Sequence, residues 1–220
     1  MKSEIDLNPI ENEVIVANPA IQLNGILAIP KNAKAVIVFA HGSDSGRFSP
    51  RNNYVARVLQ KAQFATLLMD LLTEKEVLNR ANVFDIMLLA QRLRVAKQWL
   101  AHHPKNPVKI GYFGASTGAA AALVAAAEDS GNIFSVVSRG GRPDLAEKFL
   151  PKVLAPTLLI VGGNDTGVIE LNQAAFKALT CPKEFSIIPG ATHLFEERGT
   201  LEMVAKQACD WFTKCVGGNP

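Results

Sequence analysis

A serine, an aspartate and a histidine follow one another along this chain in an order that suits nucleophilic catalysis. Ser116 lies in the pentapeptide Gly-Ala-Ser-Thr-Gly, Asp165 closely follows an apolar run, and His193 lies shortly after another such run. A serine nucleophile needs a base that takes its proton and an acid that orients the base, and the chain order Ser, Asp, His occurs with pentapeptides of this type. The pattern predicts Ser116 as nucleophile, His193 as general base and Asp165 as the acid that orients it.

The residues on either side of Ser116 favour a sharp turn from a strand into a helix. Residues 108–113 form a largely apolar run, and residues 119–127 consist of alanine, leucine and valine, which favour a helix of little bulk. Gly114 and Gly118 are small enough to let the turn close. Such a turn exposes the serine hydroxyl at the end of the strand.

A serine nucleophile also needs an oxyanion hole, in which two N–H groups point at one position. We expect the backbone N–H group of Thr117, the residue after the nucleophile, to be the first donor. The apolar run 35–40 leads into His41, Gly42 and Ser43, and we assign the second donor to the backbone N–H group of Ser43.

Two of these assignments have an alternative. Serine is common before a helix as an N-cap, so Ser116 could have a structural role only. Asp144 follows the strand-like run 133–137 and could take the place of Asp165.

The other three histidines have simpler explanations than catalysis. His102 and His103 end a long helical pattern, where histidine suits the helix dipole. His41 begins a glycine-containing turn, and we expect its ring hydrogen bonds to brace that loop. His193 is therefore the predicted base.

Length and composition limit the class of protein. With 220 residues, of which 48% are hydrophobic and 20% charged, the chain can bury one substantial core, and we expect a single domain over residues 1–220. The net charge of +3 is too small to favour a nucleic-acid partner, and the apolar runs are too short to span a membrane. Neither a metal-ligand spacing nor a dinucleotide fingerprint is present, so we expect no metal and no cofactor.

The three cysteines, Cys181, Cys209 and Cys215, are few and odd in number, which favours reduced thiols over a disulfide framework. The first residues lack a basic segment followed by an apolar core. We therefore expect a soluble cytoplasmic protein whose partner is a small molecule. The sequence gives no indication of the oligomeric state.

Strand and helix patterns alternate along most of the chain. Two early strands, 13–17 and 21–29, flank Asn18-Pro19 and predict an antiparallel hairpin at one edge of a sheet. The later strand patterns cover residues 35–40, 64–69, 108–113, 133–138, 157–161 and 184–188. The helical patterns cover residues 51–62, 79–102, 117–128, 143–150, 169–179 and 197–215. This alternation predicts an α/β fold with a mostly parallel central sheet and helices on both faces.

Four segments resemble the α/β-hydrolase fold and, within it, the small lidless group related to dienelactone hydrolase. They are residues 41–52, 114–118, 138–145 and 190–197. They are similar to hydrolases that also occur fused to phosphoribosyltransferase domains. Dienelactone hydrolases proper use a cysteine nucleophile, whereas position 116 is serine. The resemblance implies hydrolysis of carboxylic esters by a Ser-His-Asp triad.

The segments after residues 64–69 and 133–138 are too short for a large cap, which predicts an open site and a preference for short-chain esters. A thioesterase, an acyltransferase or a non-catalytic binding scaffold could carry the same residues, and the sequence leaves these alternatives open. It also leaves open whether Asp70 and Glu74 line the site.

Four arginines, Arg47, Arg51, Arg139 and Arg142, flank loops expected at the carboxyl edge of the sheet. A guanidinium group can bind a carboxylate in a fork-like geometry, and we expect Arg139 and Arg142 to bind an anionic part of the substrate. The alternative is that these arginines are solvated or paired with neighbouring acids.

Overall fold

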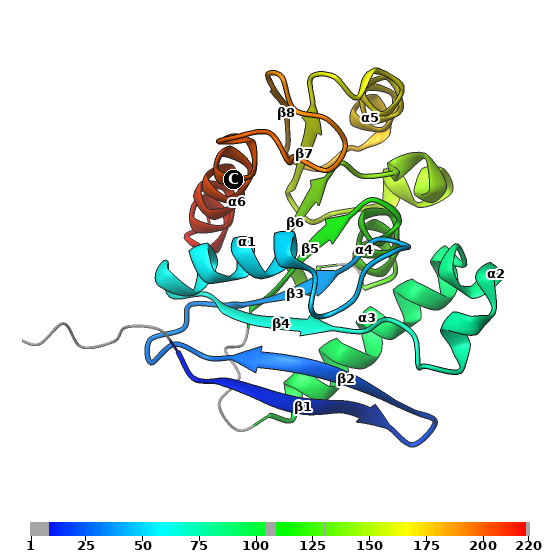
Figure 1. Cartoon of the computed structure of the whole chain (residues 1–220), viewed down its shortest axis with the longest axis vertical. Coiled ribbons are helices and arrows are strands. Elements are labelled where there is room, and N and C mark those ends of the chain that lie inside the picture. The colour runs from blue at the N-terminus through cyan, green and yellow to red at the C-terminus, as the bar shows by residue number, and fades with distance from the viewer. Residues whose placement is uncertain (1–8, 104–108, 130, 219–220) are drawn as a thin grey trace, which may run out of the picture.

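The computed structural model describes residues 9–103, 109–129 and 131–218, which form an eight-stranded sheet and the helices around it (Figure 1). The strands are β1 (Glu11–Asn18), β2 (Ile21–Ala28), β3 (Val36–Ala40), β4 (Ala65–Met69), β5 (Ile110–Ala115), β6 (Ile133–Arg139), β7 (Thr157–Gly162) and β8 (Lys183–Ile188). The α-helices are α1 (Pro50–Lys61), α2 (Arg80–Val83), α3 (Ile86–Ala101), α4 (Thr117–Glu128), α5 (Thr166–Ala178) and α6 (Thr200–Val216). The described residues also form the 3₁₀ helices η1 (Glu76–Leu78) and η2 (Pro143–Lys152).

The strand order is β1-β2-β4-β3-β5-β6-β7-β8. The strands β4, β3, β5, β6, β7 and β8 pair in parallel. Strands β1 and β2 form an antiparallel hairpin, and β2 joins the sheet by antiparallel pairing with β4. The predicted parallel sheet with an antiparallel hairpin at one edge is therefore confirmed. Because the parallel strands share one direction, the residues that follow β3 to β8 meet at one edge of the sheet.

Alternating side chains of the central strands enter two separate cores. In β3, Val36 and Val38 contact the core under α3 and α4, whereas Ile37 and Phe39 contact the core under α1 and α6. Figure 1 shows these two pairs of helices on opposite sides of the sheet. Burial on both faces explains why these strands are almost continuously apolar.

The segment predicted as one helix over residues 79–102 is divided in two. Asn79 accepts a hydrogen bond from the N–H of Ala81 and begins α2, and Asp85 accepts one from the N–H of Leu88 and begins α3. Each short polar side chain satisfies an N–H group at a helix start, so the chain begins a second helix at Asp85.

The helix predicted over residues 143–150 is the 3₁₀ helix η2, which extends to Lys152. It contains Pro151, whose nitrogen cannot donate a helical hydrogen bond. The predicted strand 108–113 begins at Ile110 and runs to Ala115; Val108 lies outside the described residues.

The segments between β4 and α3 and between β6 and β7 carry only η1, α2 and η2 besides loops, so this fold has no large cap. None of the helices in the described part of the chain has the length and apolar character needed to cross a membrane.

Candidate active site

Ser116 lies at the turn between β5 and α4. Its backbone has φ 52° and ψ −122°, and such a positive-φ conformation costs a non-glycine residue about 1–3 kcal/mol. Ser116 occupies the N-cap position of α4, but its side chain makes no capping hydrogen bond. An N-cap role therefore does not explain this serine, whereas the strained turn is the geometry of a nucleophile elbow.

Gly114 and Gly118 leave no room for a β-carbon at this turn. A Cβ on Gly114 would lie 2.4 Å from Cα of Ala119, and a Cβ on Gly118 would lie 2.2 Å from the carbonyl oxygen of Ala40. Neither glycine has a positive φ, so the turn requires their small size rather than their conformational freedom.

Asp165 and His193 are hydrogen-bonded to each other. Nδ1 of His193 lies 2.7 Å from Oδ2 of Asp165. Asp165 precedes α5 but makes no side-chain capping hydrogen bond there, so its carboxylate is available to the imidazole. When Nδ1–H donates to Asp165, Nε2 is left to accept a proton. Asp144, the alternative acid, is bound instead by Arg142.

Ser116 and His193 line one cavity of about 140 Å³ at the carboxyl edge of the sheet, together with Gly42, Ser43 and Arg139. These residues follow or end different strands, and only the parallel sheet brings them together. The nucleophile and base candidates, separated by 77 positions in the sequence, therefore face one space.

The loop after β3 packs directly against Ser116, because a Cβ on Gly42 would lie 3.1 Å from Cβ of Ser116. Ser43 follows in this loop and lines the same cavity as Ser116. Thr117 is the first residue of α4, so its N–H group has no partner within the helix. Both candidate oxyanion donors thus lie on segments next to the candidate nucleophile.

Sequence reasoning missed the glycines that let the other loops of the site approach each other. Gly140 has φ 53°, and its Cβ would lie 3.2 Å from the carbonyl oxygen of His193. A Cβ on Gly162 would lie 2.4 Å from the carbonyl oxygen of Ala191. Each glycine begins a Gly-Gly pair directly at the end of a strand pattern, and these pairs are the signal that could have indicated them.

His41 braces the loop after β3, as its position predicts. Its Nδ1–H donates to the carbonyl oxygen of Gly42 at 2.8 Å, and its Nε2 accepts the N–H of Leu71 at 3.0 Å. Burial lowers the pKa of His41, which favours the neutral ring that this pair of hydrogen bonds requires.

A second cavity, of about 200 Å³, adjoins the first and shares with it Gly42, Ser43 and Ser45. Its apolar lining consists of Leu72, Val77, Val83 and Leu89. Asp70 and Glu74 also line this cavity, which answers the question that the sequence left open. Asp70 in addition accepts the backbone N–H of Arg47 at 2.8 Å and pairs with its guanidinium group.

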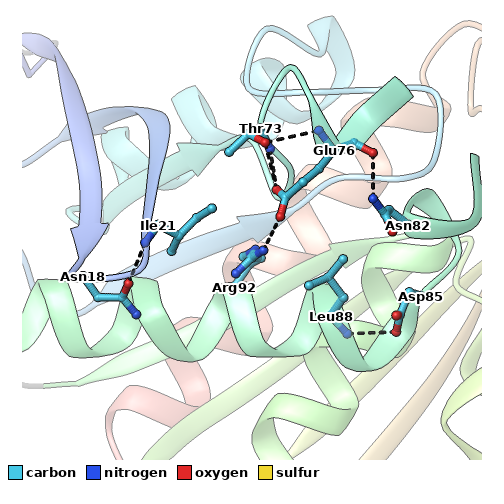
Figure 2. A network of polar contacts seen from close by, with 8 residues as sticks. All are labelled: Asn18, Ile21, Thr73, Glu76, Asn82, Asp85, Leu88 and Arg92. Carbon is cyan, nitrogen blue, oxygen red and sulfur yellow. Dashed lines mark hydrogen bonds and ion pairs between the residues drawn. The ribbon is translucent and has the colours of Figure 1, made fainter. Parts of the chain in front are cut away.

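The segment over this second cavity, residues 73–83, is fixed to α3 by a network of polar contacts (Figure 2). One carboxylate oxygen of Glu76 accepts hydrogen bonds from the N–H and hydroxyl groups of Thr73, and the other accepts one from Arg92 at 2.6 Å. Asn82 donates to the carbonyl oxygen of Glu76 at 2.9 Å. Burial opposes ionisation of Glu76, but the hydrogen bonds from Thr73 and the charge of Arg92 outweigh it and lower its pKa.

The four arginines near the site differ in their partners. Arg47 pairs with Asp70, Arg51 with Glu196, and Arg142 with Asp144. Arg139 ends β6, lines the cavity of Ser116, and makes a hydrogen bond to the side-chain oxygen of Asn52. Arg142 is not among the residues that line either cavity.

Within the described ranges, no three His, Cys, Asp or Glu side chains lie close enough together to hold a metal ion.

Residues 23–216 match the model of the dienelactone hydrolase family. The chain belongs to this family. The crystal structure of a dienelactone hydrolase from Anabaena variabilis superimposes with a TM-score of 0.92 at 54% sequence identity, covering 94% of this chain and 99% of that one. Est1E from Butyrivibrio proteoclasticus shares the fold with a TM-score of 0.80 at 17% identity, over 93% of this chain and 99% of that one.

This family member is also 58% identical over 203 residues to a Mycobacterium tuberculosis (H37Rv) protein named "Putative phosphoribosyl transferase". The match covers 92% of this chain but only 46% of the mycobacterial protein, so the chain spans about half the length of that relative. The family and its structural neighbours support a hydrolase with the α/β-hydrolase fold, as the sequence motifs predict.

Proposed function

We propose that this dienelactone hydrolase family member is a serine esterase that cleaves small carboxylic esters. The observation that carries the proposal is the 2.7 Å hydrogen bond between His193 and Asp165 at the cavity that His193 and Ser116 line together. A strained serine, a histidine and an orienting carboxylate are the parts that acyl transfer through a covalent intermediate requires.

In the proposed reaction, Nε2 of His193 takes the hydroxyl proton of Ser116 as Oγ attacks the ester carbonyl carbon. Asp165 holds the imidazole in the required tautomer and stabilises the imidazolium ion. The N–H groups of Ser43 and Thr117 bind the oxyanion. The imidazolium ion returns its proton to the leaving alcohol, which leaves an acyl group on Ser116, and water that His193 deprotonates then releases the acid.

The second cavity supports a preference for small substrates. Its volume of about 200 Å³ is below that of a typical drug-sized ligand site, about 300–1,000 Å³. Its apolar walls begin beside the two candidate oxyanion donors, Ser43 and Thr117, which line it. A short alkyl or small aryl group of the substrate fits this space, which is consistent with short-chain esters.

An organophosphonate probe that forms a covalent bond with activated serines tests the proposal. Intact mass should rise by one adduct on the parent protein and not on Ser116→Ala, because only an activated Oγ attacks phosphorus at a useful rate. Absence of an adduct on the parent, or an adduct that persists on Ser116→Ala, would contradict the assignment of the nucleophile.

Replacing Glu76 by glutamine should loosen the segment over the second cavity. The buried Arg92 then loses its carboxylate partner, which should lower the free energy of unfolding at pH 7 by about 1–2 kcal/mol. The walls that this segment forms should also fit short acyl chains less well. We therefore expect the ratio of kcat/KM for a hexanoate ester to kcat/KM for an acetate ester to rise by roughly threefold or more.

The pKa of Glu76 lies below its ordinary value of 4.5, so its contribution to stability is present above that pH and is lost as the pH falls through the lower, folded-state pKa. The stability difference between the parent and Glu76→Gln should therefore shrink in acid. Denaturant unfolding at pH 7 and at pH 3.5, with the exposed Glu170→Gln as control, measures this. An equal difference at both pH values would contradict the role of Glu76.

A further inference from the structure

Arg139 is a buried cation that has no carboxylate partner in the part of the chain that the structure describes. It is 6% exposed, its guanidinium donates to the side-chain oxygen of Asn52 at 3.3 Å, and its Nε–H has no hydrogen-bond partner among the described residues. Within the same residues it forms no ion pair closer than 4.0 Å. Burial and the nearby charge of Arg51 lower its pKa to about 10, so it remains charged at neutral pH. A buried charge is costly unless an anion compensates it.

A second guanidinium lies beside it. Arg51, in α1, lines the same cavity, and its Nε–H is also buried without a hydrogen-bond partner in the described structure. Among the described residues its ion-pair partner is Glu196, which lies 3.1 Å from NH1 and whose side chain is 64% exposed. Two cations with unused donors therefore flank one space, although their mutual repulsion opposes this arrangement.

Apart from Glu196, which pairs with Arg51, the acids near this cavity in the described structure are bound to other residues. Asp44 lines the cavity, but its carboxylate pairs with Arg80 at 3.2 Å. Asp165 is hydrogen-bonded to His193. The positive charge of Arg139 and Arg51 thus faces a cavity that also contains Ser116 and His193.

We propose that Arg139 and Arg51 bind an anionic group, a carboxylate or a phosphate, on the ester that this site cleaves. The anion lies in the cavity of Ser116, and a small apolar part of the same molecule occupies the adjoining cavity lined by Leu72, Val77, Val83 and Leu89. The shared loop, Gly42 to Ser45, lies between the two parts of the substrate. This inference rests on the proposed esterase function.

Matched ester pairs test the anion site. In the first pair the charge is on the leaving group: 3-acetoxybenzoate is compared with its neutral methyl ester. In the second pair the charge is on the acyl group: the mono-4-nitrophenyl ester of glutarate is compared with the neutral 4-nitrophenyl 5-oxohexanoate. 3-Acetoxyphenyl phosphate replaces the carboxylate of the first pair by a phosphate. The parent should prefer the charged member of at least one pair, and comparison of the carboxylate with the phosphate identifies the better anion.

In Arg139→Gln the ratio of kcat/KM for the charged ester to kcat/KM for its neutral partner should fall by roughly 10- to 100-fold. The change should appear mainly as a higher KM for the charged ester, because a charge-assisted hydrogen bond is lost. The neutral ester should change by less than about threefold, and Arg139→Lys should recover part of the preference since it keeps the charge. Arg142→Gln is the matched control, because that arginine is paired with Asp144 and lines neither cavity. An unchanged preference in an Arg139→Gln protein that still cleaves the neutral ester would overturn the proposal.

A binding measurement separates this proposal from the esterase proposal and does not depend on the folding of the Arg139 variants. Ser116→Ala should bind 3-acetoxybenzoate more tightly than the neutral methyl ester by calorimetry, and inorganic phosphate should compete with it. Equal affinity for the two esters would overturn the anion site even if the parent is an esterase. Preferential anion binding without any ester hydrolysis by the parent would overturn the esterase proposal and leave the anion site standing.

Discussion

Replacing Ser116 by alanine should lower kcat for a short-chain ester by about 10⁴- to 10⁶-fold, because the acyl-enzyme can no longer form. His193→Ala should cost a similar factor, and the double variant should be no worse than either single one, since the two residues act as a unit. Asp165→Asn should cost about 10⁴-fold, because it favours the wrong tautomer of the imidazole. Steady-state kinetics on one chromogenic acetate ester, with thermal midpoints in parallel, measures all four variants.

Ser186→Ala is the control for this series, since Ser186 lies in β8 and lines a cavity between β8 and α6 rather than the candidate site. Its activity should stay within about twofold of the parent. A Ser116→Ala protein that folds normally and keeps more than a hundredth of the parent's kcat would show that another group is the nucleophile.

Replacing Gly118 by alanine should destabilise the fold by about 3 kcal/mol or more, because the new Cβ meets backbone rather than a movable side chain. That Cβ would lie 2.2 Å from the carbonyl oxygen of Ala40 and 2.4 Å from that of His41. Relief of this contact requires α4 to move away from β3, which also displaces Ser116. We therefore expect both a lower free energy of unfolding and a loss of phosphonate labelling.

Gly167→Ala is the matched control for the Gly118 variant. Gly167 lies in the first turn of α5, has no positive φ, and a Cβ there would have no neighbour within 4 Å. Alanine at this helical position should raise the free energy of unfolding by up to about 1 kcal/mol. Urea unfolding of the two variants should thus give changes of opposite sign, and a neutral Gly118→Ala would mean that α4 does not need this close approach to β3.

The order of strands and helices could be predicted from the sequence because short, largely apolar runs alternate with longer helical patterns along most of the chain. Prediction failed where a local hydrogen bond decided the outcome. The apolar pattern is continuous across residues 79–102, yet Asp85 caps a new helix within it. Asparagine and aspartate are favoured at helix starts but also occur on exposed faces inside helices, so residue type alone does not locate the break.

The arginines illustrate the same limit at the site. Arg139 and Arg142 are three positions apart in similar Gly-rich surroundings, and the sequence treats them alike. In the structure Arg142 is held by Asp144, two residues away, whereas Arg139 ends a buried strand and lines the cavity of Ser116. Side-chain partners depend on distances across the sheet edge, and residue types alone do not carry that information.

The sequence by itself determined the class of fold and the identity of the chemical groups: a parallel sheet, a serine at a strand-to-helix turn, and an acid and a histidine after later strands. Hydrophobic periodicity and turn residues are local properties, so they can be recognised without the structure. The tertiary structure decided which groups meet. It pairs His193 with Asp165 rather than Asp144, and among the described residues it gives Arg139 the amide oxygen of Asn52 rather than an acid as partner. These pairings depend on close approaches of loops from different strands, which residues such as Gly140 and Gly162 allow only once the sheet has brought the strand ends together.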